Sequence, residues 1–482
     1  MTPAPTRRGD PRRRSHLRAG LVTAMVVGAA ACAAGPRYAP PEPPAPVTFE
    51  AGDAWKAAEP ADGAPRGQWW EIFGDARLDS LEEHLSVSNQ TLKAATAAFE
   101  QARAVVGSAR AGYFPQVGSG GGIIGSSQSE TRPNPPKDSR FTDYLLRGDV
   151  AYEADVWGRV RGTVAASRAS AEAVAADVES VGLSLHAELA IDYFQLRSLD
   201  AELQLLDSTV VALERALRLT QDRYRGGLAS GIDVAQAETQ LQATRSTALD
   251  LRVSRARLEH AVAALTGQTA SSFSLPVLGP PLAPPQVPGG LTSALLERRP
   301  DVAAAERRVA AADARVGVAR SAFFPVLALT GTAGFESASP GSWLQALSRL
   351  WTVGPVLALT VFDGGRRRAA SAQARAAHDQ ALAAYRQTLL TAFQEVEDNL
   401  AALRWLREEA ATQAAAVAAA QQTLTLAMNR YRGGLTGYLE VTAAQNAALA
   451  NERQAVVIAG RRLTATVQLV KALGGTWQRP ER

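Results

Sequence analysis

The sequence repeats itself over a long interval, and this repeat limits the fold more than any other feature. The hexapeptide Arg-Tyr-Arg-Gly-Gly-Leu occurs at 223–228 and again, 207 residues later, at 430–435. The segment 109–115 matches 319–325 in a similar way, at an offset of 210 residues. Self-similarity at a fixed interval indicates a chain built from copies of one structural unit. We therefore expect two copies of such a unit.

The repeat and the flanking composition divide the 482 residues into six predicted segments. These are a signal peptide at 1–31, a lipidated tether at 32–66, a first repeat at 67–275, a Pro-rich linker at 276–290, a second repeat at 291–475 and a tail at 476–482. Hydrophobic residues make up 46% of the chain and charged residues 20%, which excludes extended disorder.

The first 32 residues have the pattern of a bacterial export signal. Residues 1–31 hold six Arg and one acidic residue, end in an apolar stretch at 21–31, and are followed directly by Cys32. A basic segment, a short apolar segment and small residues before a cleavage point are typical of a secretory signal. The position of Cys32 resembles a lipobox, whose Cys is lipidated, although Ala29 stands where Leu is usual. A plain signal peptide with an incidental Cys32 is the alternative.

The same segment explains the basic character of the chain. It contributes +5 to a formal total of +4, so the remaining residues carry about −1. We therefore expect no basic binding face and no nucleic-acid partner. With one Cys, five widely separated His and no catalytic spacing, the sequence predicts no metal site, no cofactor and no enzyme. The Gly-rich pattern at 120–125 lacks the helix that a dinucleotide site requires.

Long helices are predicted in the second half of the first repeat. Between residues 189 and 265, apolar side chains recur mostly at alternating steps of three and four, with a turn at Gly226 and Gly227 and one interruption at Arg255. We expect a helical hairpin with arms of about 35 residues, or ~50 Å each, and a left-handed supercoil. By itself, this pattern fits a soluble coiled-coil rod equally well.

Four segments between the helices have the period of two that is typical of strands. They lie at 116–127, 145–156, 326–336 and 353–362, and the linkers 128–144 and 337–352 would join them into two hairpins. In the second segment, apolar side chains alternate with four charged ones, which are Arg147, Asp149, Glu153 and Asp155. A tilted strand of this length crosses about 25 Å, the thickness of one bilayer core.

A sheet of four strands has two open edges. In lipid, every unpaired backbone group costs several kcal/mol, so such a sheet must close with strands from other subunits. Two subunits would give eight strands filled by side chains, and three would give twelve with a lumen lined by the charged side chains. The alternative is a small antiparallel sheet in a periplasmic domain. A helical transmembrane bundle is excluded, because the mean hydropathy is −0.09 and no run of eighteen apolar residues occurs.

Several longer motifs carry a family resemblance. They are CAAGPRYAPP at 32–41, LLERRPDV at 295–302, GVARSAFFP at 317–325, FDGG at 362–365 and KALGGTW at 471–477. Together they resemble the TolC-like outer-membrane factor family, in particular the lipoprotein branch that serves RND multidrug efflux pumps. The resemblance implies a mainly α fold with a membrane β-barrel. Three identical chains would share one twelve-stranded barrel, with four strands per chain, and long helical hairpins would form an α-barrel in the periplasm.

The resemblance also implies a function, that of a passive exit duct in the outer membrane. An inner-membrane RND pump would supply the energy, a periplasmic membrane-fusion adaptor would dock on the helical tips, and acylated Cys32 would lie in outer-membrane lipid. No cofactor is implied, and the substrate is left open because selection lies in the pump. Two alternatives remain: the outer component of a type I protein secretion system, and a lipid-anchored periplasmic coiled-coil structural protein.

The resemblance further assigns roles to the two glycine turns. The adaptor-docking tips would be Gly226, Gly227, Leu228, Gly433, Gly434 and Leu435. The periplasmic gate would consist of Tyr431 facing Asp233, with Glu440 in an acidic ring. Two positions depart from the family: Thr436 stands where a gate arginine is common, and Ala443 where a second ring carboxylate is. A capping role at the start of a helix is the alternative for Asp233.

Overall fold

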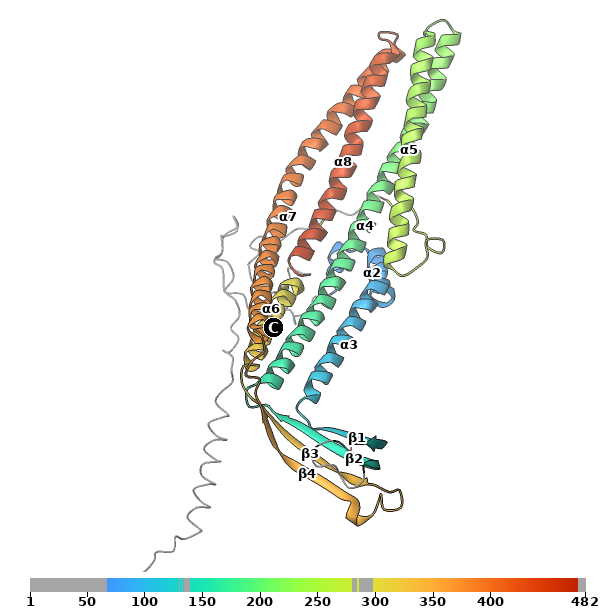
Figure 1. The fold of residues 1–482 in the computed structure, drawn as a ribbon. Helices are drawn as coiled ribbons and strands as arrows, with labels where there is room; N and C mark the ends of the chain where they lie inside the picture. Colours follow the sequence, from blue (N-terminus) through green and yellow to red (C-terminus); the bar gives the residue numbers. More distant parts are fainter. Residues whose placement is uncertain are drawn as a thin grey trace, which may run out of the picture. The chain divides into compact units, whose positions relative to one another are not determined.

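A computed structural model describes residues 67–129, 131, 133, 139–279, 284–285 and 298–475. The predicted signal peptide, Cys32, the tether, most of the linker 276–290 and the tail lie outside these residues. The described chain is mainly helical with one four-stranded sheet, which confirms the predicted fold class (Figure 1). Its residues form two compact units: Glu100–Ala173 with Glu306–Ala384, and the remaining described residues.

The elements follow one another in an order that repeats. They are η1 (Trp69–Phe73), α2 (Ala76–Ser88), α3 (Gln90–Ala111), β1 (Gln116–Ser127), β2 (Arg140–Ala154), α4 (Arg159–Arg225), α5 (Gly231–Leu265), α6 (Pro300–Ser321), β3 (Val326–Ser337), η3 (Ala346–Ser348), β4 (Arg349–Ala358), α7 (Arg366–Arg432) and α8 (Tyr438–Ala472). In both copies a helix leads into a hairpin of strands, and a long helix and a shorter one follow.

The internal repeat is visible in the lengths of the helices. Helices α4 and α7 each have 67 residues, and α5 and α8 each have 35. Helices α4 and α7 begin 207 residues apart, at Arg159 and Arg366, as do α5 and α8, at Gly231 and Tyr438. The prediction of 35 residues is therefore wrong for the first arm, which is about twice as long. Between Val164 and Leu183 its buried hydrophobic side chains are alanines, such as Ala166, rather than the large apolar residues that reveal a heptad pattern.

The four strands form an antiparallel sheet in the order β1–β2–β3–β4, within the first unit. Strands β1 and β2 pair along the whole of β1, from Gln116 opposite Ala151 to Ser127 opposite Arg140. Strand β2 therefore begins at Arg140, because it follows β1 to its end, and not at residue 145 as predicted.

Strand β4 is also displaced from its predicted position. It spans Arg349–Ala358 instead of 353–362, and its last pair joins Ala358 to Val326 of β3. Pro325, directly before Val326, has no N–H group with which to extend the pairing. The apolar residues after Ala358 therefore have no strand partner on β3.

The structure corrects the position predicted for Asp155. Strand β2 ends at Ala154, and the Asp155 carboxylate accepts hydrogen bonds from the backbone N–H groups of Val160 (2.9 Å) and Arg161 (2.8 Å) at the start of α4. Asp363 caps the start of α7 in the same manner. An acidic side chain at a helix N-terminus satisfies free N–H groups and complements the helix dipole. Asp155 is therefore a helix cap beyond the strand.

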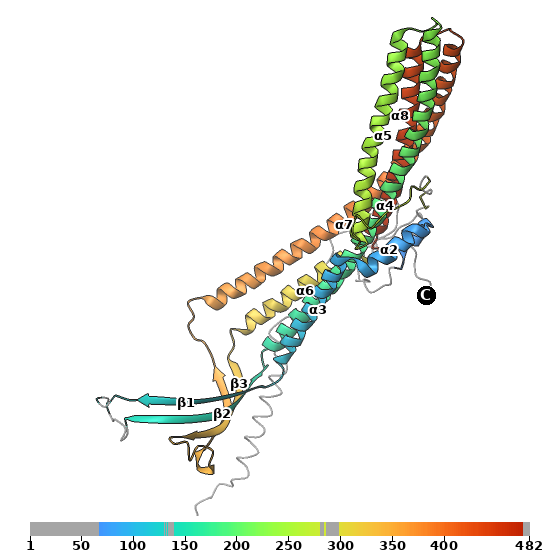
Figure 2. The same cartoon turned by 90° about the vertical axis from the view of Figure 1, so that its right-hand side faces the viewer.

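The second unit contains the aromatic core and the paired ends of the long helices. The core joins η1 and α2 to α4, α5 and α8, and its buried aromatic residues are Trp69, Trp70, Phe73, Tyr193 and Phe194. Figure 2 shows α4, α5, α7 and α8 lying side by side toward the two turns, where Leu213, Leu241, Tyr431, Tyr438 and Val441 form a second cluster. None of the described helices contains an apolar stretch of the length needed to cross a membrane.

Candidate functional site

The two predicted docking tips are glycine turns with the same geometry. Gly227 and Gly434 adopt left-handed backbone conformations, with φ of 72° and 71°. The N–H of Leu228 bonds back to the carbonyl of Arg223 (2.7 Å), and the N–H of Leu435 bonds to that of Arg430 (2.9 Å). This is the pattern of a Schellman motif, in which glycine at the left-handed position ends a helix.

Each turn presents one large apolar side chain. Leu228 is 72% exposed and Leu435 is 74% exposed. An exposed leucine next to a rigid glycine turn is suited to contact with another protein, because burying it removes apolar surface from water. The equal exposure of the two leucines means that a single chain offers the same feature twice.

Tyr431, predicted as a gate residue, is buried within the chain, at 3% exposure. Its ring packs edge-on against Tyr438, with 5.4 Å between ring centroids, and its hydroxyl donates to Thr220 Oγ1 at 3.4 Å. The Arg223 guanidinium lies over the ring, 4.7 Å from its centroid, and donates to the backbone carbonyl of Tyr431 at 3.0 Å. Tyr431 therefore belongs to a contact between the two hairpins of one chain.

Asp233 has a capping role at the start of α5. Ser230 is the N-cap residue; its Oγ accepts from the N–H of Asp233 (3.2 Å), and the Asp233 carboxylate accepts from the N–H of Ser230 (2.8 Å). These reciprocal bonds are a capping box. Among the described residues of one chain, no hydrogen bond joins Asp233 to Tyr431, so their contact across neighbouring hairpins stays a prediction.

The remaining gate positions lie at the second turn. Glu440 is exposed in the first turn of α8, where the helix dipole favours a negative charge. The hydroxyl oxygen of Thr436 is buried and has no hydrogen-bond partner among the described residues. Ala443 is exposed on α8. Of the two predicted gate carboxylates, Asp233 takes part in a capping box, whereas Glu440 is exposed and takes part in no helix cap among the described residues.

On the sheet, the predicted lumen residues of β2 are linked in short polar contacts. Arg147 and Asp149 form an ion pair at 3.3 Å, and Asp149 accepts from the hydroxyl of Thr332 on β3 at 2.8 Å. Glu153 accepts from Arg159, the first residue of α4, at 2.7 Å. Arg147, Asp149 and Glu153 alternate along β2, so they lie on one face of the sheet.

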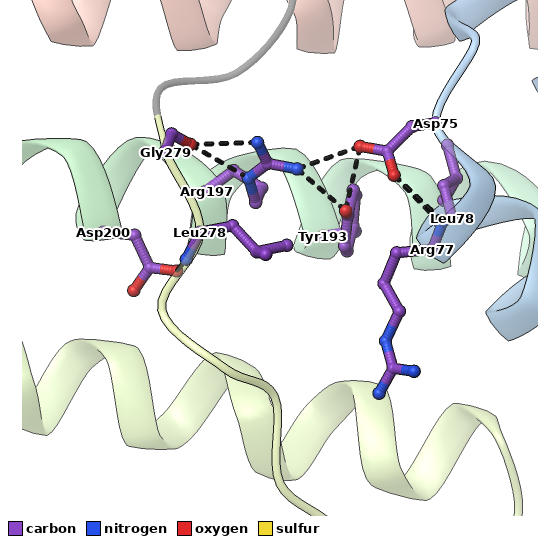
Figure 3. Close-up of polar contacts among 8 residues, drawn as sticks. All are labelled: Asp75, Arg77, Leu78, Tyr193, Arg197, Asp200, Leu278 and Gly279. Atoms are coloured by element: carbon purple, nitrogen blue, oxygen red, sulfur yellow. Dashed lines mark hydrogen bonds and ion pairs between the residues drawn. The ribbon is translucent and has the colours of Figure 1, made fainter.

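A buried polar network holds the start of the linker between the two repeats in place. The network was not predicted from the sequence. Figure 3 shows Arg197 of α4 between the cap of α2 and the linker. Its guanidinium donates to the Asp75 carboxylate, to the Tyr193 hydroxyl and to the Gly279 carbonyl, each at 2.9 Å. Asp75 also caps α2, by accepting from the N–H of Arg77 at 3.1 Å. Arg197 therefore ties three segments that are far apart in sequence.

Helix α5 also binds this part of the chain, at Leu275 directly before the linker. Arg255 pairs with Asp200 of α4 (2.6 Å) and donates to the carbonyl of Leu275 (2.7 Å). Glu259 accepts from the N–H of Leu275 (2.6 Å), and Asp200 accepts from that of Leu278 (3.3 Å). The isolated interruption of the heptad pattern at Arg255 was the one sequence signal of this network. We call Arg197, Asp200, Arg255 and Glu259 the linker clamp.

A second buried polar contact lies in the aromatic core. Glu82 of α2 and His186 of α4 are 2.6 Å apart, and the His186 ring stacks on Trp70 with 4.6 Å between centroids. Burial, with a smaller contribution from Asp79, raises the pKa of the Glu82 carboxyl to about 9. Burial also lowers the pKa of the His186 imidazole to about 4. Both groups are therefore uncharged near neutral pH, and the protonated carboxyl can donate a hydrogen bond to the imidazole nitrogen.

This pair predicts a pH dependence of stability. Between its ordinary pKa and about 9, folded Glu82 holds a proton that the unfolded chain has released, so the free energy of unfolding falls as pH rises. Between about 4 and its ordinary pKa of 6.5, His186 acts in the opposite direction. Of these two groups, only Glu82 changes the free energy of unfolding above pH ~6.5. We expect Glu82→Gln to flatten the loss of stability from pH ~6.5 to ~9, measured as the unfolding midpoint in detergent.

The neighbouring exposed residue gives the control for this measurement. Glu83 lies on the same helix and is exposed, so Glu83→Gln should leave the pH profile unchanged. Identical profiles for wild type and Glu82→Gln would contradict a protonated Glu82.

No group of three or more His, Cys, Asp or Glu side chains in the described part of the chain is arranged to hold a metal ion. The described residues instead form long paired helices, a sheet whose strands β1 and β4 are each paired on one side only, and two glycine turns with exposed leucines.

The comparisons with known proteins agree with this geometry. Residues 83–268 and 291–475 both match the outer membrane efflux protein family. The chain is 32% identical to the outer membrane protein OprJ of Pseudomonas aeruginosa over 474 residues, covering 95% of each protein. It is 31% identical to the toluene efflux pump outer membrane protein TtgC of Pseudomonas putida over 462 residues, covering 95% of this chain and 94% of TtgC.

Solved structures give the same result. The outer-membrane channel OprN superposes with a TM-score of 0.83 at 29% identity, covering 93% of this chain and all of OprN. CusC superposes with a TM-score of 0.82 at 26% identity, covering 92% of this chain and all of CusC.

Fold, repeat and relatives define the class of the protein: it is an outer-membrane efflux channel. The chain belongs to the outer membrane efflux protein family, whose members are channel proteins rather than enzymes. The efflux function predicted from the sequence is thereby confirmed.

Proposed function

We propose that three identical chains form the exit duct of a tripartite efflux system. The observation that carries this proposal is the sheet, in which β1 and β4 are each paired on one side only. Four strands cannot close alone, whereas three copies give twelve strands and a lumen wide enough for solutes. Arg147, Asp149 and Glu153 would line this lumen, and each chain would contribute the two repeats predicted at 67–275 and 291–475.

The partners follow from the passive nature of such a duct. An inner-membrane RND pump would supply energy, and a periplasmic adaptor would dock on the tips formed by Gly226–Leu228 and Gly433–Leu435. The two exposed leucines and the rigid turns support this assignment, because together they offer six equivalent apolar contacts in a trimer. Relatives named for toluene efflux and cation efflux indicate that the substrate varies within the family.

The N-terminus would be anchored through Cys32. It is the only Cys of the chain and follows the predicted signal peptide directly. Three acyl chains on this residue would add membrane affinity to that of the inserted strands. Mass spectrometry of the N-terminal peptide tests this: a mature chain that begins beyond residue 32 without acylation would refute it.

Conductance tests the duct and its gate together. The purified protein should run as a trimer in mild detergent and form channels in planar bilayers. The double variant Tyr431→Phe with Asp233→Ala should raise the single-channel conductance. A monodisperse monomer would contradict the duct.

The variant Glu440→Gln tests the acidic ring. It should lower the preference of the channel for cations, because it removes a ring of three negative charges.

Ser230→Ala separates a gate from a cap at Asp233. It removes the hydroxyl of the capping box, at a cost of about 1 kcal/mol, but leaves the Asp233 carboxylate in place. If Ser230→Ala raises conductance as much as Asp233→Ala does, Asp233 acts only as a cap.

A further inference from the structure

The two hairpins of one chain are joined at their tips by Arg223. Its guanidinium donates to the carbonyl oxygens of Tyr431 (3.0 Å) and Arg432 (3.3 Å), which end α7, and lies over the Tyr431 ring. Carbonyl groups at a helix C-terminus lack partners within the helix and attract a cation. We call this arrangement the Arg223 contact. It holds the second tip against the first.

The internal repeat supplies a second copy of every group in this contact. At the offset of 207 residues, Arg430 corresponds to Arg223, Tyr224 to Tyr431, and Arg225 to Arg432. The second copy is unused within the chain: Tyr224 is 54% exposed, and the exposed Arg430 side chain has no hydrogen bond or ion pair with the described residues. The donor and its acceptors lie at the two turns, on opposite hairpins.

We propose that Arg430 makes the equivalent contact between subunits. In the trimer, which this inference takes from the proposed function, the second hairpin of one chain lies beside the first hairpin of the next. Its Arg430 guanidinium donates to the backbone carbonyls of the partner's Tyr224 and the partner's Arg225 and lies over the ring of the partner's Tyr224. A ring of six arginine contacts then closes around the tips, three within chains and three between them.

The two halves of this ring differ in strength. Tyr438, which packs against the Tyr431 ring, corresponds to Gly231, and Thr220, which accepts the Tyr431 hydroxyl, corresponds to Ala427. The ring of Tyr224 already lies by Gly231, since a Cβ there would be 3.9 Å from Tyr224 Cε2. Compared with the Arg223 contact, the contact between subunits therefore lacks one aromatic neighbour of the tyrosine ring and one hydroxyl that accepts from the tyrosine. It is the weaker half and opens first.

Paired cysteines distinguish the two contacts. Arg430→Cys with Arg225→Cys, treated with a bismaleimide whose spacer matches an arginine side chain, should give covalent dimers and trimers after denaturation. The matched pair, Arg223→Cys with Arg432→Cys, should cross-link within the chain and leave the mass of a monomer. Each of the four single-cysteine variants, treated in the same way, controls for cross-links that involve Cys32.

The outcomes separate this inference from the proposed function. If the protein runs as a trimer in mild detergent but the Arg430–Arg225 pair yields only monomers, the contact between subunits is refuted while the duct stands. If no trimer forms at all, the duct is refuted and the inference with it.

Conductance gives an independent test. Arg223→Gln and Arg430→Gln should each raise the open fraction of channels at least about tenfold, because each variant removes three charge-assisted contacts from the ring. The effect of the double variant should exceed that of either single variant. An effect of Arg223→Gln alone, with Arg430→Gln identical to wild type, would overturn the proposal.

Discussion

Replacing Asp200 with alanine is expected to lower the free energy of unfolding by about 3–5 kcal/mol, among the largest effects of any single substitution in this chain. Asp200 is 0% exposed and accepts from Arg255 at 2.6 Å and from the N–H of Leu278 at 3.3 Å. Its removal leaves the Arg255 guanidinium, which is only 13% exposed, with Glu259 as its remaining carboxylate partner at 3.1 Å, and it leaves the N–H of Leu278 without the Asp200 acceptor. Thermal unfolding in detergent measures the loss.

The same pair of helices contains a matched control. Asp207 and Arg252 form an exposed ion pair at 3.4 Å between α4 and α5. Exposed pairs contribute little, so Asp207→Ala should change stability by less than about 1 kcal/mol. Adding Arg255→Leu to Asp200→Ala should recover part of the loss, because it removes a largely desolvated guanidinium that has lost one of its two carboxylate partners and restores an apolar residue to the heptad pattern. Equal stability of Asp200→Ala and Asp207→Ala would contradict the linker clamp.

Replacing Gly460 with leucine is expected to cost about 3 kcal/mol and to separate α8 from α4. A Cβ at Gly460 would overlap the hydroxyl oxygen of Ser198 and lie 3.1 Å from the Ser198 Cβ. A Cβ at Gly460 therefore requires Ser198 to shift or α8 to move away from α4, and either change loosens close packing between the two helices. The unfolding midpoint and the yield of assembled protein measure the effect.

Two further variants make this prediction specific to the close approach. Gly317 on α6 has nothing within 4 Å of a Cβ, so Gly317→Ala should be neutral or stabilise by up to about 1 kcal/mol. Ser198→Gly should partly rescue Gly460→Ala, because it removes the atoms that the new Cβ would meet. A Gly460→Leu variant as stable as wild type would show that α4 and α8 can move apart freely.

The sequence predicted the features that depend on local pattern. The repeated hexapeptide located both turns, and the alternation around Arg147 located β2, because a turn and a half-buried strand each leave a short-range signature. The end of β4 could not be predicted in this way. It depends on Pro325, which lies more than thirty residues earlier in the chain and meets β4 only in the folded sheet.

The same difference between local patterns and contacts that form only in the folded chain applies to the polar sites. Asp233 next to a glycine turn suggested a helix cap, and the structure confirms a capping box with Ser230. The linker clamp was missed, because its partners come from α4, α5 and a linker whose path no local pattern specifies. Arg255 marked the place, as a charge in an apolar series, but Arg197 and Asp200 gave no comparable signal.

The equal lengths of the paired helices restrict how genes for such chains can evolve. Inserting one residue into α4 would rotate everything beyond it by about 100° and turn its buried face to solvent. Inserting seven residues would preserve the face but lengthen one arm by ~10 Å, so that its turn would no longer be level with the turn of the other hairpin. Length can therefore change only in all four long helices together, by whole heptads, whereas substitutions can accumulate one at a time. Homologous genes should consequently differ by insertions in their loops and hardly at all in the spacing between a helix start and its glycine turn.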